Sequence, residues 1–225
     1  MNTNTYSKEI TTAINNFLNE DDWHFSFDEQ RGLFNFGLNL KSKIKHIKYI
    51  VEVQEDEFLV YAVSPIGADE DDEKMMKTMA EFICRANYGL KNGNFELDMR
   101  DGEIRYKSFV SCGGITPTPE MIKRSIYCPA TMFEQYGDGI VDIILGNATA
   151  KSAIEKCEKS SEEELRSVIA QLVEDDDNGD MDVMMARLAA RLGIDEVPSE
   201  TDSEESEHIL SDIKIDLFES EGEDE

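Results

Sequence analysis

Closely spaced carboxylates in residues 174–182 have the clearest capacity for chemistry in this sequence. Short-spaced carboxylates before a glycine are typical of an EF-hand calcium loop. With Gly179 at the sixth position of such a loop, the candidate ligands include Asp176, Asn178, Asp180 and Asp182. The first position is Glu174 rather than Asp, and the twelfth, which should supply a bidentate glutamate, is Met185. We therefore interpret this segment as a solvated acidic loop, with a calcium site as the alternative, and we expect no cofactor.

The cysteines and histidines show no spacing that predicts a metal site or a disulfide framework. The four cysteines, which include no Cys-x-x-Cys pair, are Cys84, Cys112, Cys128 and Cys157. Such spacing is typical of reduced thiols, and we expect Cys84, which lies between apolar residues of a predicted helix, to be a buried thiol. None of the three histidines has a second histidine or a cysteine three or four residues away, so a histidine metal site is not predicted.

Two charged segments are candidates for binding another protein. The only concentrated basic cluster consists of Lys41, Lys43, Lys45 and Lys48. Lysines of this kind commonly protect a strand edge, but they could also bind an acidic partner, including the chain's own tail. Residues 198–225 hold 12 acidic residues and one base, Lys214. Within this tail, apolar residues that could add to a sheet edge are Ile213, Ile215, Leu217 and Phe218.

A helix and a hairpin over residues 69–110 form the centre of the predicted fold. Apolar residues recur at separations of three and four along one stripe: Met75, Met76, Met79, Phe82, Ile83, Ala86 and Leu90. The alternating runs 94–100 and 103–110 flank Asp101-Gly102, which predicts a hairpin with a two-residue type I′ turn. This register would place Met99 opposite Ile104 and Glu96 opposite Lys107, with one apolar face and one charged face.

This segment also resembles a known family. Residues Ala80–Leu90, followed by Gly93–Asp98 and Asp101–Tyr106, are similar to the YbjN domain family, described as bacterial sensory transduction regulators. The family pattern is a helix ending in an Asn-Tyr-Gly turn, a Gly-Asn-Phe-Glu-Leu strand and a return strand reading Gly-Glu-Ile-Arg-Tyr. The resemblance extends from the first residues to about Cys157. It implies a fold like that of type III secretion chaperones, which are α+β modules that hold other proteins, and it brings no catalytic residues.

The remaining patterns complete an α+β fold. Residues 6–18 have helical spacing, and four runs with strand character follow at 23–27, 34–40, 47–53 and 58–63. Thr118-Pro119 predicts a helix start, and Pro129 predicts a kink or a second start. We expect an antiparallel sheet with flanking helices, type III secretion chaperone-like, plus C-terminal helices and a disordered acidic tail. The predicted segments are 1–157 as the α+β domain, 158–197 as a helical hairpin and 198–225 as the tail.

Composition restricts the function that these elements serve. The chain has 225 residues, with 49 acidic and 22 basic residues and a net charge of −27. Such a charge disfavours nucleic acid and anionic membranes as partners. The sequence has no apolar run of about 18 residues and no signal-peptide pattern at its start, so we expect a cytoplasmic bacterial protein.

The functional hypothesis combines these observations. We expect a non-catalytic protein-binding module, either chaperone-like or a regulatory adaptor, whose partner is another protein, with homodimer formation. The alternatives are a small-ligand or Ca²⁺-responsive sensor, and an enzyme with an unrecognised site.

Overall fold

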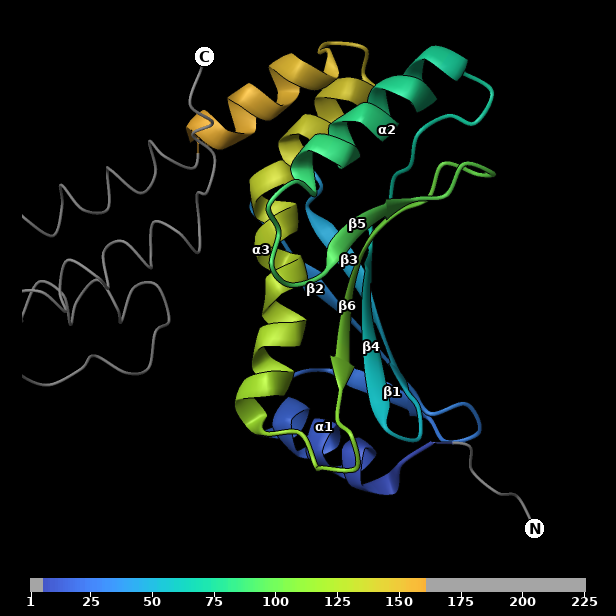
Figure 1. Cartoon of the computed structure of the whole chain (residues 1–225), viewed down its shortest axis with the longest axis vertical. Helices are drawn as coiled ribbons and strands as arrows, with labels where there is room; N and C mark the ends of the chain where they lie inside the picture. Colours follow the sequence, from blue (N-terminus) through green and yellow to red (C-terminus); the bar gives the residue numbers. More distant parts are fainter. Residues whose placement is uncertain (1–5, 161–225) are drawn as a thin grey trace, which may run out of the picture. The chain divides into compact units, whose positions relative to one another are not determined.

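Six strands form one antiparallel sheet in the computed structural model, which describes residues 6–160 (Figure 1). The strands are β1 (Phe25–Asp28), β2 (Leu33–Asn39), β3 (His46–Val53), β4 (Glu57–Val63), β5 (Asn94–Leu97) and β6 (Ile104–Ser111). Their spatial order is β1-β2-β3-β4-β6-β5, so β1 and β5 are the two edges. The first of two compact units of the chain ends at Cys157. This α+β architecture is the fold class that the sequence predicts.

Three helices accompany the sheet, and their first residues follow capping rules. They are α1 (Lys8–Glu20), α2 (Glu73–Ala86) and α3 (Pro119–Ile144), and residues 150–160 are also helical. Side chains of Ser7, Asp72 and Thr118 accept hydrogen bonds from the first-turn amides of these helices. Among the described residues, no helix is long and apolar enough to cross a membrane.

The core lies between the helices and one face of the sheet. Along β3, Ile47, Tyr49, Val51 and Val53 are buried, whereas the alternate residues are exposed or half-buried. Figure 1 shows α3 running along the sheet, and its closest strands are β6 and β4. The largest fully buried side chains are those of Tyr49, Tyr106, Phe34, Phe58, Phe82 and Phe133. The fold therefore has two layers, and the second face of the sheet carries no helix among the described residues.

The helix α3 continues through Pro129, where the sequence predicted a kink or a new start. Residues 119–144 form one helix of 26 residues with Pro129 buried inside it. A proline removes one helical hydrogen bond, and close to this position the buried Tyr49 hydroxyl donates to the carbonyl of Ile126, with an O···O distance of 2.7 Å. Residues 140–144 complete α3, and Leu145 is its C-cap.

The β5–β6 hairpin forms as predicted, but its register differs by two residues. Ile104 lies opposite Leu97 and not Met99, and Arg105 lies opposite Glu96. Because successive side chains of a strand alternate between its two faces, an offset of two keeps each paired residue on the predicted face of the hairpin. Met99, however, lies in a longer loop and is 60% exposed.

Local hydrogen bonds explain this longer loop. The Asp98 carboxylate accepts from the backbone amide of Arg100 at 2.9 Å, and the Asp98 carbonyl accepts from Gly102 at 2.8 Å. A type I′ turn needs a positive φ at both central residues. Of the two predicted central residues, Asp101 and Gly102, only Gly102 has a positive φ, of 71°. A Cβ at Gly102 would lie 1.9 Å from the carbonyl oxygen of Ala68, so this loop packs directly on the segment after β4.

Candidate protein-binding surface

The lysine cluster lies in the loop between β2 and β3 and at the start of β3, and not at an edge of the sheet. The prediction of a strand edge is wrong, because β2 and β4 flank β3 on both sides. Local alternation does not reveal the strand order, which is why the sequence pattern failed here. Lys41, Lys43 and Lys45 belong to residues 40–45, which we name the lysine loop.

Carboxylates on α3 attach the lysine loop to the helix. Glu134 accepts from the backbone amides of Lys41 and Ser42, with N···O distances of 2.7 and 2.8 Å, and Asp138 accepts from the amide of Lys43 at 2.7 Å. The two acids, together with Asp142, are spaced four residues apart, so they lie along one side of α3. The backbone N–H groups of the lysine loop therefore donate to carboxylates that lie along one side of α3.

Asp142 forms the most enclosed ion pairs of this attachment. Its side chain is 12% exposed and pairs with the ammonium groups of Lys43 and Lys156, the latter at 2.7 Å. Hydrogen bonds from Lys156 and Lys43 lower the pKa of this carboxyl below its ordinary value, despite the opposing effect of burial. Asp142 thus links the lysine loop to the helical residues 150–160.

Gly137 allows the loop to approach the helix closely. A Cβ at this position would lie 2.9 Å from both the Ser42 hydroxyl and the Ile44 side chain. Lys45 returns the chain toward β3 with a positive φ of 65°, and its ammonium donates to the Lys41 carbonyl at 2.8 Å. The lysines at 41, 43 and 45 therefore contribute to internal structure, through their backbones or side chains.

Lys48 differs from the other three because it points to the helix-free face of the sheet. It is exposed, and it lies opposite Gly37 on one side and Val63 on the other. Lys48 thus belongs to a different surface, which we name the open face.

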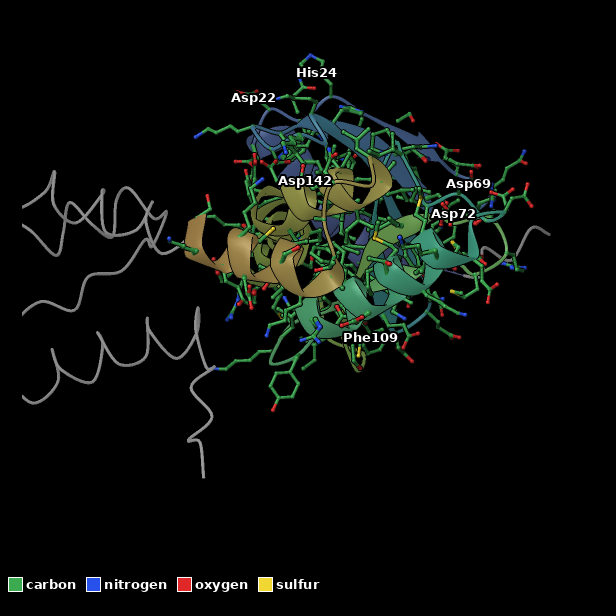
Figure 2. The ribbon with its side chains drawn as sticks, turned by 90° about the horizontal axis from the view of Figure 1, so that it is seen from above. Asp22, His24, Asp69, Asp72, Phe109 and Asp142 are labelled. Carbon is green, nitrogen blue, oxygen red and sulfur yellow. The ribbon has the colours of Figure 1, made fainter. Side chains whose placement is uncertain are left out.

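The open face has an apolar centre formed by three adjacent strands. Leu59, Tyr61 and Val63 occupy this side of β4; Ile50 of β3 lies opposite Tyr61, and Phe109 of β6 lies opposite Leu59. The Phe109 side chain is 50% exposed, and the other four residues are half-buried. Figure 2 labels Phe109 well apart from Asp142, which lies among the helices. Side chains from separate strands therefore create a continuous apolar patch.

Charged residues of both signs border this patch. Glu96 pairs with Arg105, at 2.8 Å, and with Lys107, and the Arg105 guanidinium lies 4.6 Å above the centre of the Tyr61 ring. Burial raises the pKa of Glu96, but hydrogen bonds from Lys107 and Arg105 outweigh it, so the net shift is downward. Glu52 and Lys48 border the opposite side, facing Leu59 and Val63 across the strands. An apolar centre with a mixed charged border is the usual anatomy of a protein interface.

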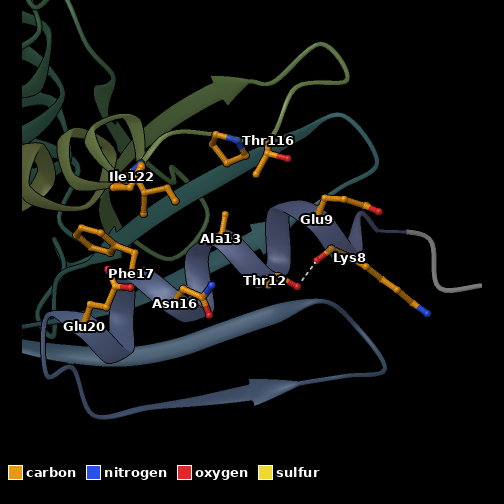
Figure 3. A pocket seen from close by; sticks show the side chains of 11 residues that line it. Lys8, Glu9, Thr12, Ala13, Asn16, Phe17, Glu20, Thr116 and Ile122 are labelled. Carbon is orange, nitrogen blue, oxygen red and sulfur yellow. Dashed lines mark hydrogen bonds between the residues drawn. The ribbon is translucent and has the colours of Figure 1, made fainter.

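Within residues 6–160, hollows also lie beside the helices α1 and α2. One is an open groove of about 510 Å³ between α1 and residues 116–122, where Ala13, Phe17 and Ile122 supply apolar contacts (Figure 3). The other lies beside the start of α2, near Asp69 and Asp72 (Figure 2). The carboxylates of both aspartates already accept backbone hydrogen bonds, from Asp71 and Met75 respectively, so they serve the local structure of this turn.

Three of the four cysteines in the described residues are covered by neighbouring groups, and the fourth, Cys84, is exposed. The prediction that Cys84 is buried is wrong, because it lies on the outer side of α2 and is exposed. Burial raises the pKa of Cys157 to about 11 and also raises the pKa values of Cys112 and Cys128. Since the thiolate is the nucleophile, these three thiols remain protonated near neutral pH.

Several predicted site residues lie outside the described residues. They are Asp176, Asn178, Asp180, Asp182, Ile213, Ile215, Leu217 and Phe218. Within residues 6–160, no group of three or more His, Cys, Asp or Glu side chains could hold a metal ion.

Comparison with known proteins gives no family for the chain. No family model matches it, and no curated protein matches it. The resemblance to the YbjN domain family therefore stays a prediction.

The sequence contains one signal for the open face. Residues 58–63 form a continuous apolar run, which is typical of a strand covered on both faces. The helices of residues 6–160 cover the face that carries Phe58, Val60 and Ala62. The alternate side chains of the same run therefore form the centre of the open face.

Proposed function

We propose that this chain is a non-catalytic protein-binding module, chaperone-like or regulatory, and that the open face binds its partner. The observation that carries this proposal is the apolar centre of the open face, which lies on β4, a central strand, rather than on a loop. Strands hold such side chains in fixed positions, so a partner meets a preformed surface.

The border of the open face indicates what kind of partner fits. Lys48 and Glu52 on one side, with Arg105 and Lys107 on the other, supply both signs of charge around Tyr61. Such a border suits a polypeptide with apolar residues flanked by mixed charges better than the uniformly negative backbone of a nucleic acid. The expected homodimer is one form of this proposal, in which a second copy presents the same face.

Peptide selection on the full chain tests this proposal with a matched pair of variants. Peptides selected from a random library for binding to the unmodified protein should bind Phe109→Lys at least about tenfold more weakly, because an ammonium then occupies the apolar centre. The control is Ile115→Lys, which alters a side chain that is 74% exposed and lies in the loop after β6, outside this patch.

Amide chemical shifts complete the test by showing where the selected peptides bind. We expect the largest changes at Leu59, Tyr61 and Phe109. Equal binding by both variants, or shift changes confined to the groove beside α1, would refute the assignment of the open face.

A further inference from the structure

The two edges of the sheet differ in how their backbone groups are paired. At the β5 edge, the carboxamide of Asn87 accepts from the backbone amide of Phe95 at 2.7 Å and donates to its carbonyl at 2.9 Å. A side chain therefore occupies the positions that another strand would use, and the centre of β5 is closed to further pairing.

At the β1 edge, the outer backbone groups belong to the two phenylalanines of the strand. The Gly32 carbonyl accepts from the Val53 amide on β3, so the even-numbered residues of β2 bond to β3 and the odd-numbered ones bond to β1. The odd-numbered residues of β2 lie opposite the even-numbered residues of β1. The N–H and C=O groups of Phe25 and Phe27 therefore point away from the sheet, and they have no hydrogen-bond partner among the described residues.

The side chains of Phe25 and Phe27 are incompletely covered on the helix side of the sheet. They pack on Phe34 of β2, with ring centroids 5.7 and 4.4 Å away. Phe34 is fully buried, but the two phenylalanines of β1 are only half-buried. The strand contains neither lysine nor proline, which commonly protect an exposed strand edge. The β1 edge thus offers both backbone groups and apolar side chains to another strand.

The sequence of this edge is complementary to itself in an antiparallel arrangement. Residues 24–28 read His-Phe-Ser-Phe-Asp, with the phenylalanines placed symmetrically about Ser26 and an imidazole and a carboxylate at the two ends. If two copies pair with their Ser26 residues opposite each other, each Phe25 lies opposite Phe27 of the second copy, and each His24 lies opposite its Asp28. Such self-complementarity is what a two-fold symmetric dimer requires, because both copies present the same surface.

We propose that β1 pairs with β1 of a second copy of this chain in this register and joins the two sheets into one. The N–H and C=O groups of Phe25 then exchange hydrogen bonds with those of the second copy's Phe27, and the two-fold symmetry repeats this pair. The phenylalanines of both copies form one apolar cluster on the helix side. On the other side, the ring of His24, which points away from the ribbon in Figure 2, meets the second copy's Asp28.

Hydrogen bonds within the chain favour this register over its neighbours. Because only the odd-numbered residues of β1 point their backbone groups outward, the register shifts in steps of two. One neighbouring register needs the Trp23 amide, which already donates to the Leu18 carbonyl at 2.8 Å. The other needs the Glu29 carbonyl, which already accepts from the Tyr6 hydroxyl at 2.8 Å. The register centred on Ser26 uses only groups that have no other partner within residues 6–160.

The turn after β1 holds Asp28 in place for this contact. Its Oδ1 atom accepts from the backbone amides of Gln30 and Arg31, at 2.9 and 3.2 Å. Its Oδ2 atom accepts no hydrogen bond from the described residues. One carboxylate oxygen therefore remains for an imidazole N–H of the second copy's His24, which is a donor in both the neutral and the protonated ring.

The pairing leaves the open face of each copy uncovered. Opposite residues of antiparallel strands lie on the same side of a sheet, so the helices of both copies share one side and both open faces share the other. The inference therefore does not rest on the proposed function of the open face. A Phe109→Lys variant, which alters that face, should dimerise as the unmodified chain does.

Disulfide trapping in the full chain tests the pairing. Ser26→Cys, combined with Cys84→Ser to remove an exposed thiol, places two thiols opposite each other at a non-hydrogen-bonded pair. The Cα atoms of such a pair are about 4.5 Å apart, within the range that a disulfide spans. We expect mild oxidation to convert this variant into a linked dimer. Thr131→Cys in the same background, exposed on α3, should give at least about tenfold less, and equal yields would overturn the inference.

Amide hydrogen exchange, measured over a range of protein concentrations with light scattering, gives an independent test. The amides of Phe25 and Phe27 should exchange at least about tenfold more slowly in the dimer than in the diluted monomer. The Ser26 amide, which points toward β2, should stay protected in both. Unprotected Phe25 and Phe27 amides in a dimer would overturn the inference. Protection of these amides in a monomer, or a chain that is a monomer at every concentration, would also overturn it.

A pair of variants at His24 tests the register. His24→Lys and His24→Glu replace the same exposed side chain by opposite charges. The dissociation constant of the dimer should be at least about tenfold higher for His24→Glu than for His24→Lys, because a carboxylate then meets Asp28 at both symmetric positions. Equal dissociation constants would refute the register centred on Ser26.

Discussion

Among single residues, Asp142 pairs with two ammonium groups although its side chain is only 12% exposed. Replacement by Asn keeps the shape of the side chain but removes the charge that faces Lys43 and Lys156. Hydrogen bonds to charged groups contribute about 1.5–3 kcal/mol each, and partial exposure of the lysines reduces this value. We expect Asp142→Asn to lower the free energy of unfolding in urea by about 1–3 kcal/mol.

The control for this variant is Glu155→Gln, which breaks an exposed pair with Lys151. Exposed pairs contribute little, so its unfolding free energy should change by less than about 1 kcal/mol. Equal effects of the two variants would contradict the special position of Asp142.

The pH dependence of the same residue follows from its lowered pKa. A carboxyl whose pKa is lower in the folded than in the unfolded state stabilises the fold above its unfolded pKa, near 4, and loses this contribution as the pH falls through its folded pKa. The difference in unfolding free energy between the unmodified chain and Asp142→Asn should therefore be constant near neutral pH and shrink below about pH 4. A difference that grows with acidification would contradict this account.

Glu134 tests the attachment of the lysine loop by its backbone. Glu134→Ala leaves the amides of Lys41 and Ser42 without their acceptor. Lys41 is exposed, so water can replace its acceptor, whereas Ser42 is buried, and an unsatisfied donor there costs about 1–3 kcal/mol. Glu134→Gln, which retains one acceptor oxygen, should cost less. Urea unfolding measures both, with Glu81→Ala as a control that breaks only an exposed pair with Arg85. If the two Glu134 variants matched the Glu81 control, the loop would not depend on this carboxylate.

At the level of elements, the Asn87 side chain pairs with the outer backbone groups of the edge strand β5 at Phe95. Asn87→Ala removes both hydrogen bonds to Phe95, and we expect a loss of about 1–3 kcal/mol in unfolding free energy. The Phe95 amide should also exchange faster. Asn87→Asp, which can still accept from the Phe95 amide, should retain part of its protection, and identical exchange in the two variants would show that the carboxamide does not close this edge.

Local patterns predicted most elements but not their arrangement. The alternation of residues 34–40 and 47–53, and the Thr118-Pro119 start, correspond to strands and a cap in the structure. The predicted hairpin register was wrong because the Asp98 side chain accepts a hydrogen bond from the Arg100 amide and lengthens the loop. The alternation of apolar and polar residues does not show this hydrogen bond. The position of the lysine loop was wrong because strand order depends on long-range pairing.

For the whole molecule, the two-layer architecture explains why local sequence patterns do not reveal the open face. An apolar run such as 58–63 predicts burial on both faces, and the placement of the helices within residues 6–160 shows which face those helices cover. The net charge is also distributed unevenly along the chain. Residues 158–225 hold 24 acidic and 5 basic residues, so this part accounts for −19 of the net charge of −27. The domain of residues 1–157 is therefore much less acidic than the chain as a whole.

Site-specific photo-crosslinking tests the central claim, which is that the open face is where this protein meets its partner. A benzophenone side chain at Phe109 of the full chain, irradiated in an extract of the source cells, should give a discrete adduct with another protein or with a second copy. The same group at Ile115, which is at least as exposed, should not. An adduct of equal yield at both positions, or at Ile115 alone, would contradict the account.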